Sequence, residues 1–322
     1  MDLKPHRTLV PAVLATAILA VACSSGGGGS TSATSPSIRS TQPKISATTT
    51  TTIVPAIDLH LPTEIEQVTN LPGFDIFRPK DLNAAGRRLP VIVWANGGCV
   101  RFNGVWQSLL ERWAAAGNIV VAIGTPKLSD PAAPATTTAD DQAKAIDWTF
   151  HENSRVASPF AGKLDTARVV AAGNSCGGIT TMTLAARDRR VRAVFVLSGS
   201  SVLPGGSRAA AAAVMRKVRV PIGYITGGPT DISRPMMLQD YAVAAPGVPV
   251  YLALRRVGDH VVVSTKPSVL AEVADISTNW LDYVLYGTPR ARNNLLPAPC
   301  PSCPAGTWAA ESKNFEIRPS SS

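Results

Sequence analysis

A serine flanked by glycines, in Gly173-Asn-Ser-Cys-Gly177, is the segment of this chain best suited to chemistry. A serine hydroxyl becomes a nucleophile when a neighbouring base removes its proton. The apolar residues 169–172 precede Ser175 and a helical pattern over 179–187 follows it, which predicts a buried strand, a sharp turn and a helix. Glycine suits both flanking positions, because side chains there would collide with neighbouring backbone. The alternative is a glycine-rich turn with a structural role only.

One histidine is placed to serve Ser175 as a base. His260 follows the serine in the chain and comes directly after an apolar segment, 250–254, that predicts a strand. In open α/β sheets, ligands bind at the carboxyl ends of the strands, which is where His260 would emerge. A loop histidine satisfied by backbone groups is the alternative. The histidines that precede the serine are His6, His60 and His151.

A carboxylate must hold the histidine in the tautomer that accepts the proton. Asp231 lies on a loop after an apolar strand segment and is the preferred candidate. Asp259 is the rival, but the side chains of adjacent loop residues usually diverge, so it is poorly placed to contact His260. Asp240 falls in a helical stretch, and we interpret it as a surface or capping charge.

Short apolar runs alternate with helical patterns through the rest of the chain. The strand segments are 89–95, 119–123, 169–172, 192–197, 220–226 and 248–254, and the clearest helical segments are 106–116, 138–153 and 269–286. Such alternation is typical of βαβ units. It predicts one α/β domain over residues 53–322, with a mostly parallel central sheet and helices on both faces.

Four segments together resemble the α/β-hydrolase superfamily, and within it the secreted dienelactone-hydrolase-like and polyester-hydrolase-like esterases. The segments are 94–99, 173–178, 227–231 and 258–260. The chain order serine, aspartate, histidine is also that of the α/β-hydrolase fold. The resemblance covers about residues 75–286. It implies a carboxylic ester hydrolase that works through an acyl-enzyme, with Ser175 as nucleophile, His260 as base, Asp231 as the orienting acid and no cofactor.

The resemblance also implies an oxyanion hole, in which backbone N–H groups stabilise the tetrahedral intermediate. Cys176 would supply one donor, and Gly98 or Cys99 the other. Asn96 stands where related enzymes carry a histidine. If both segments border the hole, Cys99 and Cys176 are close enough to form a disulfide. A tight turn that needs glycines remains the alternative for 96–99.

Two further cysteines, Cys300 and Cys303, lie in a proline-rich loop. In a secreted protein this spacing favours a disulfide between them, which would staple the C-terminal tail of the domain. The alternative is half of a zinc site, but the chain offers no second ligand pair with suitable spacing. We therefore expect no metal site.

The N-terminus has the features of a secretion signal. Basic residues precede an apolar run, 9–22, which is shorter than the roughly 20 residues of a membrane-spanning helix. Residues 19–23 resemble the lipobox of bacterial lipoproteins, although Ala20 stands where leucine is usual. This implies a signal peptide over 1–22, acylation of Cys23 and a membrane anchor outside the cytoplasm. Cleavage of an ordinary signal and release is the alternative.

Residues 23–52 are rich in Gly, Ser and Thr and predict a disordered tether. The formal net charge is +9, but the basic residues are spread through the domain between apolar strands. We interpret them as solvated charges at sheet edges and helix ends. A nucleic-acid-binding protein would interleave basic and aromatic residues on one element, so we expect no nucleic-acid partner.

The sequence says less about which residues contact the substrate. The segment after Ser198 is too short for a lipase lid, which favours small or surface-accessible esters. Residues that would line an acyl pocket or belong to the ordinary core are Phe102, Trp106, Met236 and Met237. Two other functions remain open: acyl transfer to an envelope acceptor, and a non-catalytic surface lipoprotein that keeps the fold.

Overall fold

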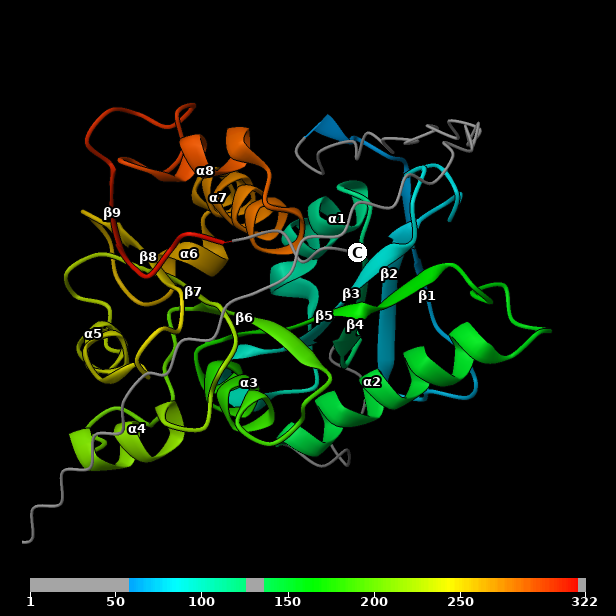
Figure 1. Cartoon of the computed structure of the whole chain (residues 1–322), viewed down its shortest axis with the longest axis horizontal. Coiled ribbons are helices and arrows are strands. Elements are labelled where there is room, and N and C mark those ends of the chain that lie inside the picture. Colours follow the sequence, from blue (N-terminus) through cyan, green and yellow to red (C-terminus); the bar gives the residue numbers. More distant parts are fainter. Residues whose placement is uncertain (1–57, 126–135, 318–322) are drawn as a thin grey trace, which may run out of the picture. The chain divides into compact units, whose positions relative to one another are not determined.

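The computed structural model describes residues 58–125 and 136–317. The predicted signal peptide, Cys23 and the predicted tether lie outside the described residues. Within the described part of the chain, the strands form one nine-stranded sheet in the order β1-β2-β4-β3-β5-β6-β7-β8-β9 (Figure 1). The strands from β4 to β8 in this order are parallel, and β1, β2 and β9 are antiparallel to their neighbours.

The strand bounds are β1 Thr63–Glu66, β2 Phe74–Pro79, β3 Leu89–Ala95, β4 Ile119–Ile123, β5 Leu164–Asn174, β6 Val191–Leu197, β7 Ile222–Thr226, β8 Val250–Arg255 and β9 Trp308–Lys313. The helix bounds are α1 Gln107–Ala115, α2 Ala139–Ser154, α3 Cys176–Ala185, α4 Arg208–Met215, α5 Arg234–Val243, α6 Val262–Thr265, α7 Pro267–Tyr286 and α8 Pro289–Leu295. The predicted class, a mostly parallel α/β sheet with helices, is confirmed.

The central strands are apolar along their whole length because helices cover both faces of the sheet. Every residue of β3, β4 and β7 is buried. On one face, α1 and α7 cover the sheet with a core that includes Trp113 and Trp280. On the other, α2, α3 and α5 contribute Ile146, Met182 and Met237 (Figure 1).

The sheet extends further at both edges than the sequence analysis predicts. β1 and β2 were not predicted, and the segment treated as a tail after Tyr286 contains α8 and the edge strand β9. β1 and β9 carry charged, partly exposed side chains, so they lack the apolar run by which a central strand is recognised. Polar edge strands of this kind prevent pairing with other chains. The Cys300–Cys303 disulfide lies in the connection to β9.

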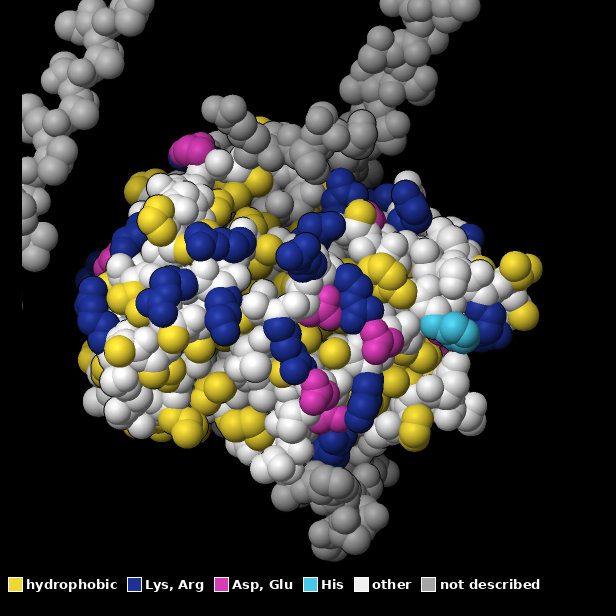
Figure 2. Space-filling view, turned by 60° about the horizontal axis from the view of Figure 1, so that its bottom comes forward, with side chains coloured by type: hydrophobic (Ala, Val, Ile, Leu, Met, Phe, Trp, Pro, Cys, Tyr) yellow, Lys and Arg dark blue, Asp and Glu magenta, His cyan; other side chains and the backbone are white. Residues whose placement is uncertain are grey.

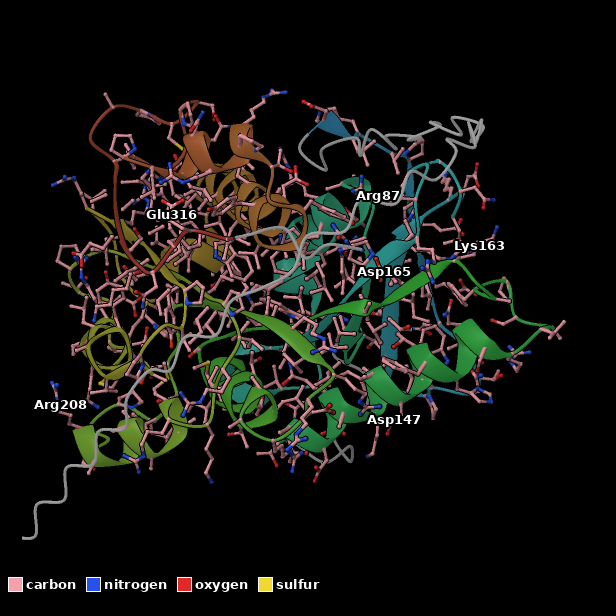
Figure 3. All side chains as sticks on the ribbon, viewed as in Figure 1. Arg87, Asp147, Lys163, Asp165, Arg208 and Glu316 are labelled. Carbon is pink, nitrogen blue, oxygen red and sulfur yellow. A yellow bond between two sulfur atoms is a disulfide. The ribbon has the colours of Figure 1, made fainter. Side chains whose placement is uncertain are left out.

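Most charged side chains lie on the outside of the fold. Arg208 at the start of α4 and Asp147 on α2 point away from the sheet (Figure 3). On the face drawn in Figure 2, Lys and Arg side chains are scattered among uncharged and apolar atoms instead of forming one continuous patch. No helix in the described ranges is both long enough and apolar enough to cross a membrane.

Candidate active site

Ser175 lies in a strained turn between β5 and α3. Its backbone has φ 50° and ψ −119°, a conformation that an L-residue rarely adopts and that costs free energy wherever the surroundings enforce it. The flanking glycines are required by close approach: a Cβ on Gly173 would lie 2.4 Å from the Gly177 carbonyl oxygen, and one on Gly177 would lie 2.2 Å from that of Ala95. The turn therefore holds the serine at the carboxyl end of the central strand.

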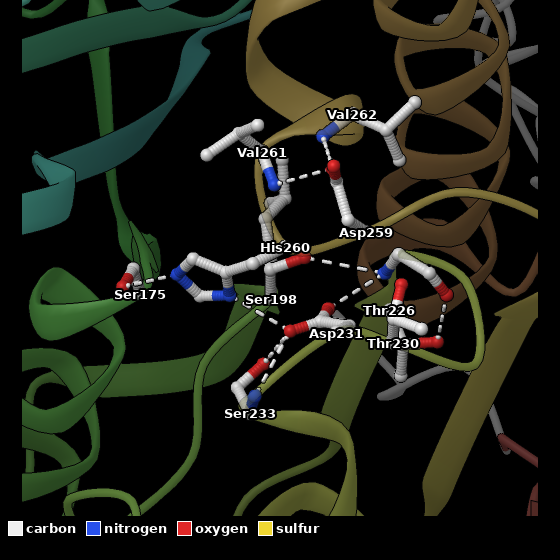
Figure 4. Close-up of polar contacts among 12 residues, drawn as sticks. Ser175, Ser198, Thr226, Thr230, Asp231, Ser233, Asp259, His260, Val261 and Val262 are labelled. Atoms are coloured by element: carbon white, nitrogen blue, oxygen red, sulfur yellow. Dashed lines mark hydrogen bonds and ion pairs between the residues drawn. The ribbon is translucent and has the colours of Figure 1, made fainter.

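Two loops from neighbouring strands bring a histidine and an aspartate to this serine (Figure 4). His260 follows β8, and its Nε2 lies 2.8 Å from Ser175 Oγ. Asp231 follows β7, and its Oδ1 lies 2.7 Å from His260 Nδ1. If Nδ1–H donates to the carboxylate, Nε2 is free to accept the serine proton. The three side chains form the continuous hydrogen-bonded chain that general-base activation of a serine requires.

Asp231 is buried and is held as a carboxylate. Its Oδ1 also accepts from the backbone N–H and the hydroxyl of Ser233, at 2.9 and 2.8 Å, and its Oδ2 accepts from the Gly227 N–H at 2.8 Å. Burial by itself raises the pKa of Asp231, but hydrogen bonds from His260, Ser198 and Ser233 outweigh it, and the pKa lies below its ordinary value of 3.8. The carboxylate stays ionised and can stabilise a protonated imidazole.

The other two aspartates have structural contacts. Asp259 Oδ1 accepts from the backbone N–H groups of Val261 and Val262, at 3.2 and 3.1 Å, and so caps the start of α6 (Figure 4). Asp240 does not carry the surface or capping charge that the sequence analysis assigns to it. Its side chain is fully buried, because helix α5 directs it inward toward β7 and not toward solvent.

The predicted oxyanion donors lie beside the nucleophile. Helix α3 begins at Cys176, so the N–H of this residue has no partner within the helix. Gly97–Cys99 forms a 3₁₀ turn, in which Gly98 and Cys99 both have positive φ. The Cys99–Cys176 disulfide joins the two segments, with Cα atoms 5.3 Å apart. The structure thus brings together, next to Ser175, the two segments that contain the predicted donors.

Asn96 supports the loop that contains these donors. Its side-chain amide donates to the carbonyl oxygens of Val100 and Ile123, at 2.9 and 2.7 Å, and its carbonyl accepts from the Trp94 indole at 2.8 Å. Both ends of the loop are therefore tied to β3 and β4 by one fully buried side chain. An asparagine side chain can bridge two acceptors and a donor in this way.

A small cavity of about 80 Å³ adjoins Ser175. It is lined by Ser175, Cys176, Ile179, Ser198, Gly199, Ser200, Val202, Leu203, Pro204, Ile232, Ser233 and His260. None of the aromatic and methionine residues considered for an acyl pocket lines it; Trp106 and Met237 are buried in the core. We refer to this space as the cleft cavity. A larger hollow of about 640 Å³ lies between α1, α7 and α8. None of the catalytic triad candidates, Ser175, Asp231 and His260, lines it.

Sequence reasoning missed the residues that hold the triad in place. Ser198 Oγ accepts from the Gly227 N–H at 3.2 Å, and Ser233 contacts Asp231 directly. Neither residue belongs to a motif, and Ser198 reaches the acid only because β6 and β7 are adjacent in the sheet. The signal available in the sequence was the serine two residues after Asp231, a spacing at which a hydroxyl and an N–H can bind the same carboxylate.

The stability of the protein should depend on pH through Asp231. Because the pKa of Asp231 is lower in the folded protein than its ordinary value of 3.8, the stabilisation is present above that pH and is lost as the pH falls below it. Urea unfolding measured between about pH 6 and pH 3 should show a falling free energy of unfolding, with a smaller fall in Asp231→Asn. Equal pH dependence in both proteins would contradict this assignment.

Residues 61–202 match the family model PETase, which is described as PET hydrolase-like. Among curated proteins, none matches the chain. The matched region contains Ser175 and the oxyanion segment but ends before Asp231 and His260, so these two residues are placed by the structure alone. Together with the sheet topology, the match identifies the α/β-hydrolase fold. In the ranges that the structure describes, no group of three or more His, Cys, Asp and Glu residues could hold a metal ion.

Proposed function

We propose that this protein is a serine-dependent carboxylic ester hydrolase that works through an acyl-enzyme. The observation that carries the proposal is the unbroken chain from Ser175 Oγ through His260 to Asp231, beside two candidate oxyanion donors. The match to a PET hydrolase-like family supports ester bonds as the target.

The geometry assigns each group a step. Ser175 Oγ attacks the ester carbonyl carbon while His260 Nε2 takes its proton, and Asp231 stabilises the resulting imidazolium. The N–H groups of Cys176 and of the turn Gly97–Cys99 stabilise the negative oxygen. His260 then protonates the departing alcohol as the C–O bond breaks. Water, activated by the same histidine, releases the acid and regenerates the serine.

Exposed apolar side chains occur in the segments next to the site, and two of them, Leu203 and Ile232, line the cleft cavity. Val100, Leu203, Ile232, Val257 and Val261 are exposed, and each lies in a segment that lines or flanks the triad. We call these residues the apolar rim. Exposed apolar patches of this kind mark interaction sites. With so small a cavity beside the serine, the rim favours short esters or esters presented at an apolar surface, polyesters included.

A fluorophosphonate probe tests the proposal directly, because it reacts only with an activated serine. The folded protein should be labelled at one site, and peptide mapping should place the adduct on Ser175. Hydrolysis of p-nitrophenyl acetate and of a polyester suspension should accompany the labelling. A folded protein that neither reacts with the probe nor hydrolyses either ester would be a non-catalytic member of the fold.

The disulfide beside the oxyanion hole gives a second test. Replacing both Cys99 and Cys176 with serine should lower the free energy of unfolding by about 2–4 kcal/mol, since the bond closes a long loop. It should lower kcat by about tenfold and change KM less, because the donors act on the transition state. The matched control is the Cys300→Ser, Cys303→Ser variant, which removes a disulfide remote from the site. Equal kcat values in the two variants would argue against a role in oxyanion binding.

We further propose that the enzyme is held at the outer face of the membrane by a lipid on Cys23. The signal-like N-terminus and the lipobox-like segment support this. Protein expressed with its own leader should partition into the detergent phase of a Triton X-114 extraction, and Cys23→Ser should remain in the aqueous phase. Aqueous partitioning of both proteins would instead indicate a released esterase.

A further inference from the structure

A buried carboxylate outside the triad lies behind the wall of the cleft cavity. Asp240 on α5 is fully buried, and no ion pair in the described part of the chain includes it. It accepts hydrogen bonds from the backbone N–H of Ser201 at 2.6 Å, from the Ser201 hydroxyl at 2.5 Å and from the Tyr224 hydroxyl at 3.1 Å. Burying a charge costs free energy, and an apolar residue would often fill such a position as well or better. We therefore look for the role of this carboxylate in the segment that it binds.

The segment that Asp240 binds is the loop 198–204, which follows β6 and precedes α4. Residues of this loop that line the cleft cavity are Ser198, Gly199, Ser200, Val202, Leu203 and Pro204. Ser201 is the one residue of the loop that does not line it, and its side chain is bound by Asp240 instead. The loop also touches the nucleophile, since a Cβ on Gly199 would lie 2.8 Å from the Ser175 carbonyl oxygen.

We propose that Asp240 is a positioning residue that sets the acyl selectivity of the enzyme. By binding both the N–H and the hydroxyl of Ser201, it fixes the loop 198–204 from behind and gives the cleft cavity a defined wall. Long acyl chains need that wall more than an acetyl group, which reaches little beyond the serine. The inference rests on the proposed function, because it concerns the acyl group that Ser175 accepts.

The carboxyl group of Asp240 is able to titrate near neutral pH. Burial raises the pKa of Asp240 to about 6, against the hydrogen bonds of Ser201 and Tyr224, which lower it. Tyr224 is the titratable group that faces it; burial raises the pKa of this tyrosine well above its ordinary value, so it stays neutral. The sulfur atoms of Met182 and Met215, on α3 and α4, lie 4.0 Å from the tyrosine hydroxyl. Protonation of Asp240 removes an acceptor site that Ser201 uses.

The experiment compares kcat/KM for p-nitrophenyl octanoate and p-nitrophenyl acetate in Asp240→Asn and Ser201→Ala. We expect the octanoate value to fall by about tenfold, mainly through KM, and the acetate value to change by less than about threefold. The ratio of the two values isolates Asp240, because a change in the reacting groups themselves affects both substrates alike. In the wild type this ratio should rise between about pH 5 and pH 7, and in Asp240→Asn it should stay flat.

Glu152→Gln is the matched control. Glu152 is also a buried carboxylate that accepts from a serine hydroxyl, that of Ser158, but it lies on α2 away from the cleft. Its replacement should leave the ratio unchanged. Hydrogen exchange of residues 198–204 should accelerate by about tenfold in Asp240→Asn and remain unchanged in the control.

A ratio within about twofold of the wild type in the folded variants would overturn the proposal. If Asp240→Asn does not fold, Ser201→Ala decides alone, since it removes one of the contacts and leaves the carboxylate in place. Failure of the proposed function has a different signature: the wild-type protein would hydrolyse neither ester, and Asp240 would then have no acyl group to select.

Discussion

Ser175→Ala is expected to lower kcat for p-nitrophenyl acetate by about 10⁴- to 10⁶-fold, the largest effect of any single substitution in the chain. The hydroxyl is the atom that bonds to the acyl group, and alanine leaves His260 with no proton to take. Residual hydrolysis would come from the oxyanion donors and bound water alone. Steady-state kinetics should be combined with fluorophosphonate labelling, which should vanish in the variant.

The fold should survive this substitution. Ser175 holds a strained backbone conformation, and alanine occupies no more space than serine, so thermal unfolding should change little. Ser154→Ala is the matched control, because Ser154 is an exposed serine on α2 that donates to the His151 carbonyl far from the cleft. Persistent labelling of a folded Ser175→Ala protein would show that another residue is the nucleophile.

Asp231→Asn is expected to lower kcat by about 10³- to 10⁴-fold with little change in KM. The carboxylate accepts the Nδ1 proton of His260 and thereby keeps Nε2 unprotonated toward the serine. An amide can instead donate to Nδ1, which moves the proton to Nε2 and removes the base. It also cannot stabilise the imidazolium that forms during attack. Labelling by the fluorophosphonate should slow by a similar factor.

Asp259→Asn distinguishes the two candidate acids. Asp259 precedes His260 in the chain but binds the N–H groups at the start of α6. An asparagine oxygen can accept from the same groups, so its replacement keeps this contact and removes none with His260. We expect it to lose less than about tenfold in kcat. If the losses were reversed between the two variants, the orienting carboxylate would be Asp259.

The sequence was most informative where one feature had to satisfy several requirements at once. Residues 169–177 had to form a buried strand, a turn free of side chains and a helix start, and few alternatives fit that combination. The central strands were predictable for the same reason, since burial on both faces leaves an uninterrupted apolar run. The edge strands β1 and β9 could not be predicted, because they contain charges at partly exposed positions and bury little surface.

Contacts made across the sheet could not be predicted from the chain. Asp240 lies on a helix whose pattern suits an exposed charge, and only the packing of α5 against β7 brings it to Ser201 and Tyr224. Ser198 likewise supports the acid because β6 and β7 are neighbours. Polar residues of this kind lack a local pattern, since the partners that explain them are distant in the chain.

The disulfide between Cys99 and Cys176 makes the state of the active site depend on the redox conditions around the protein. Its two cysteines are separated by 77 residues and lie next to β3 and β5, which pair in the sheet. Disulfides persist in oxidising compartments and are rare in the cytoplasm, where thiols are kept reduced. A newly made chain inside the cell would therefore lack the brace on its oxyanion hole. Under the proposed function, ester hydrolysis would reach its full rate only where these two cysteines are oxidised.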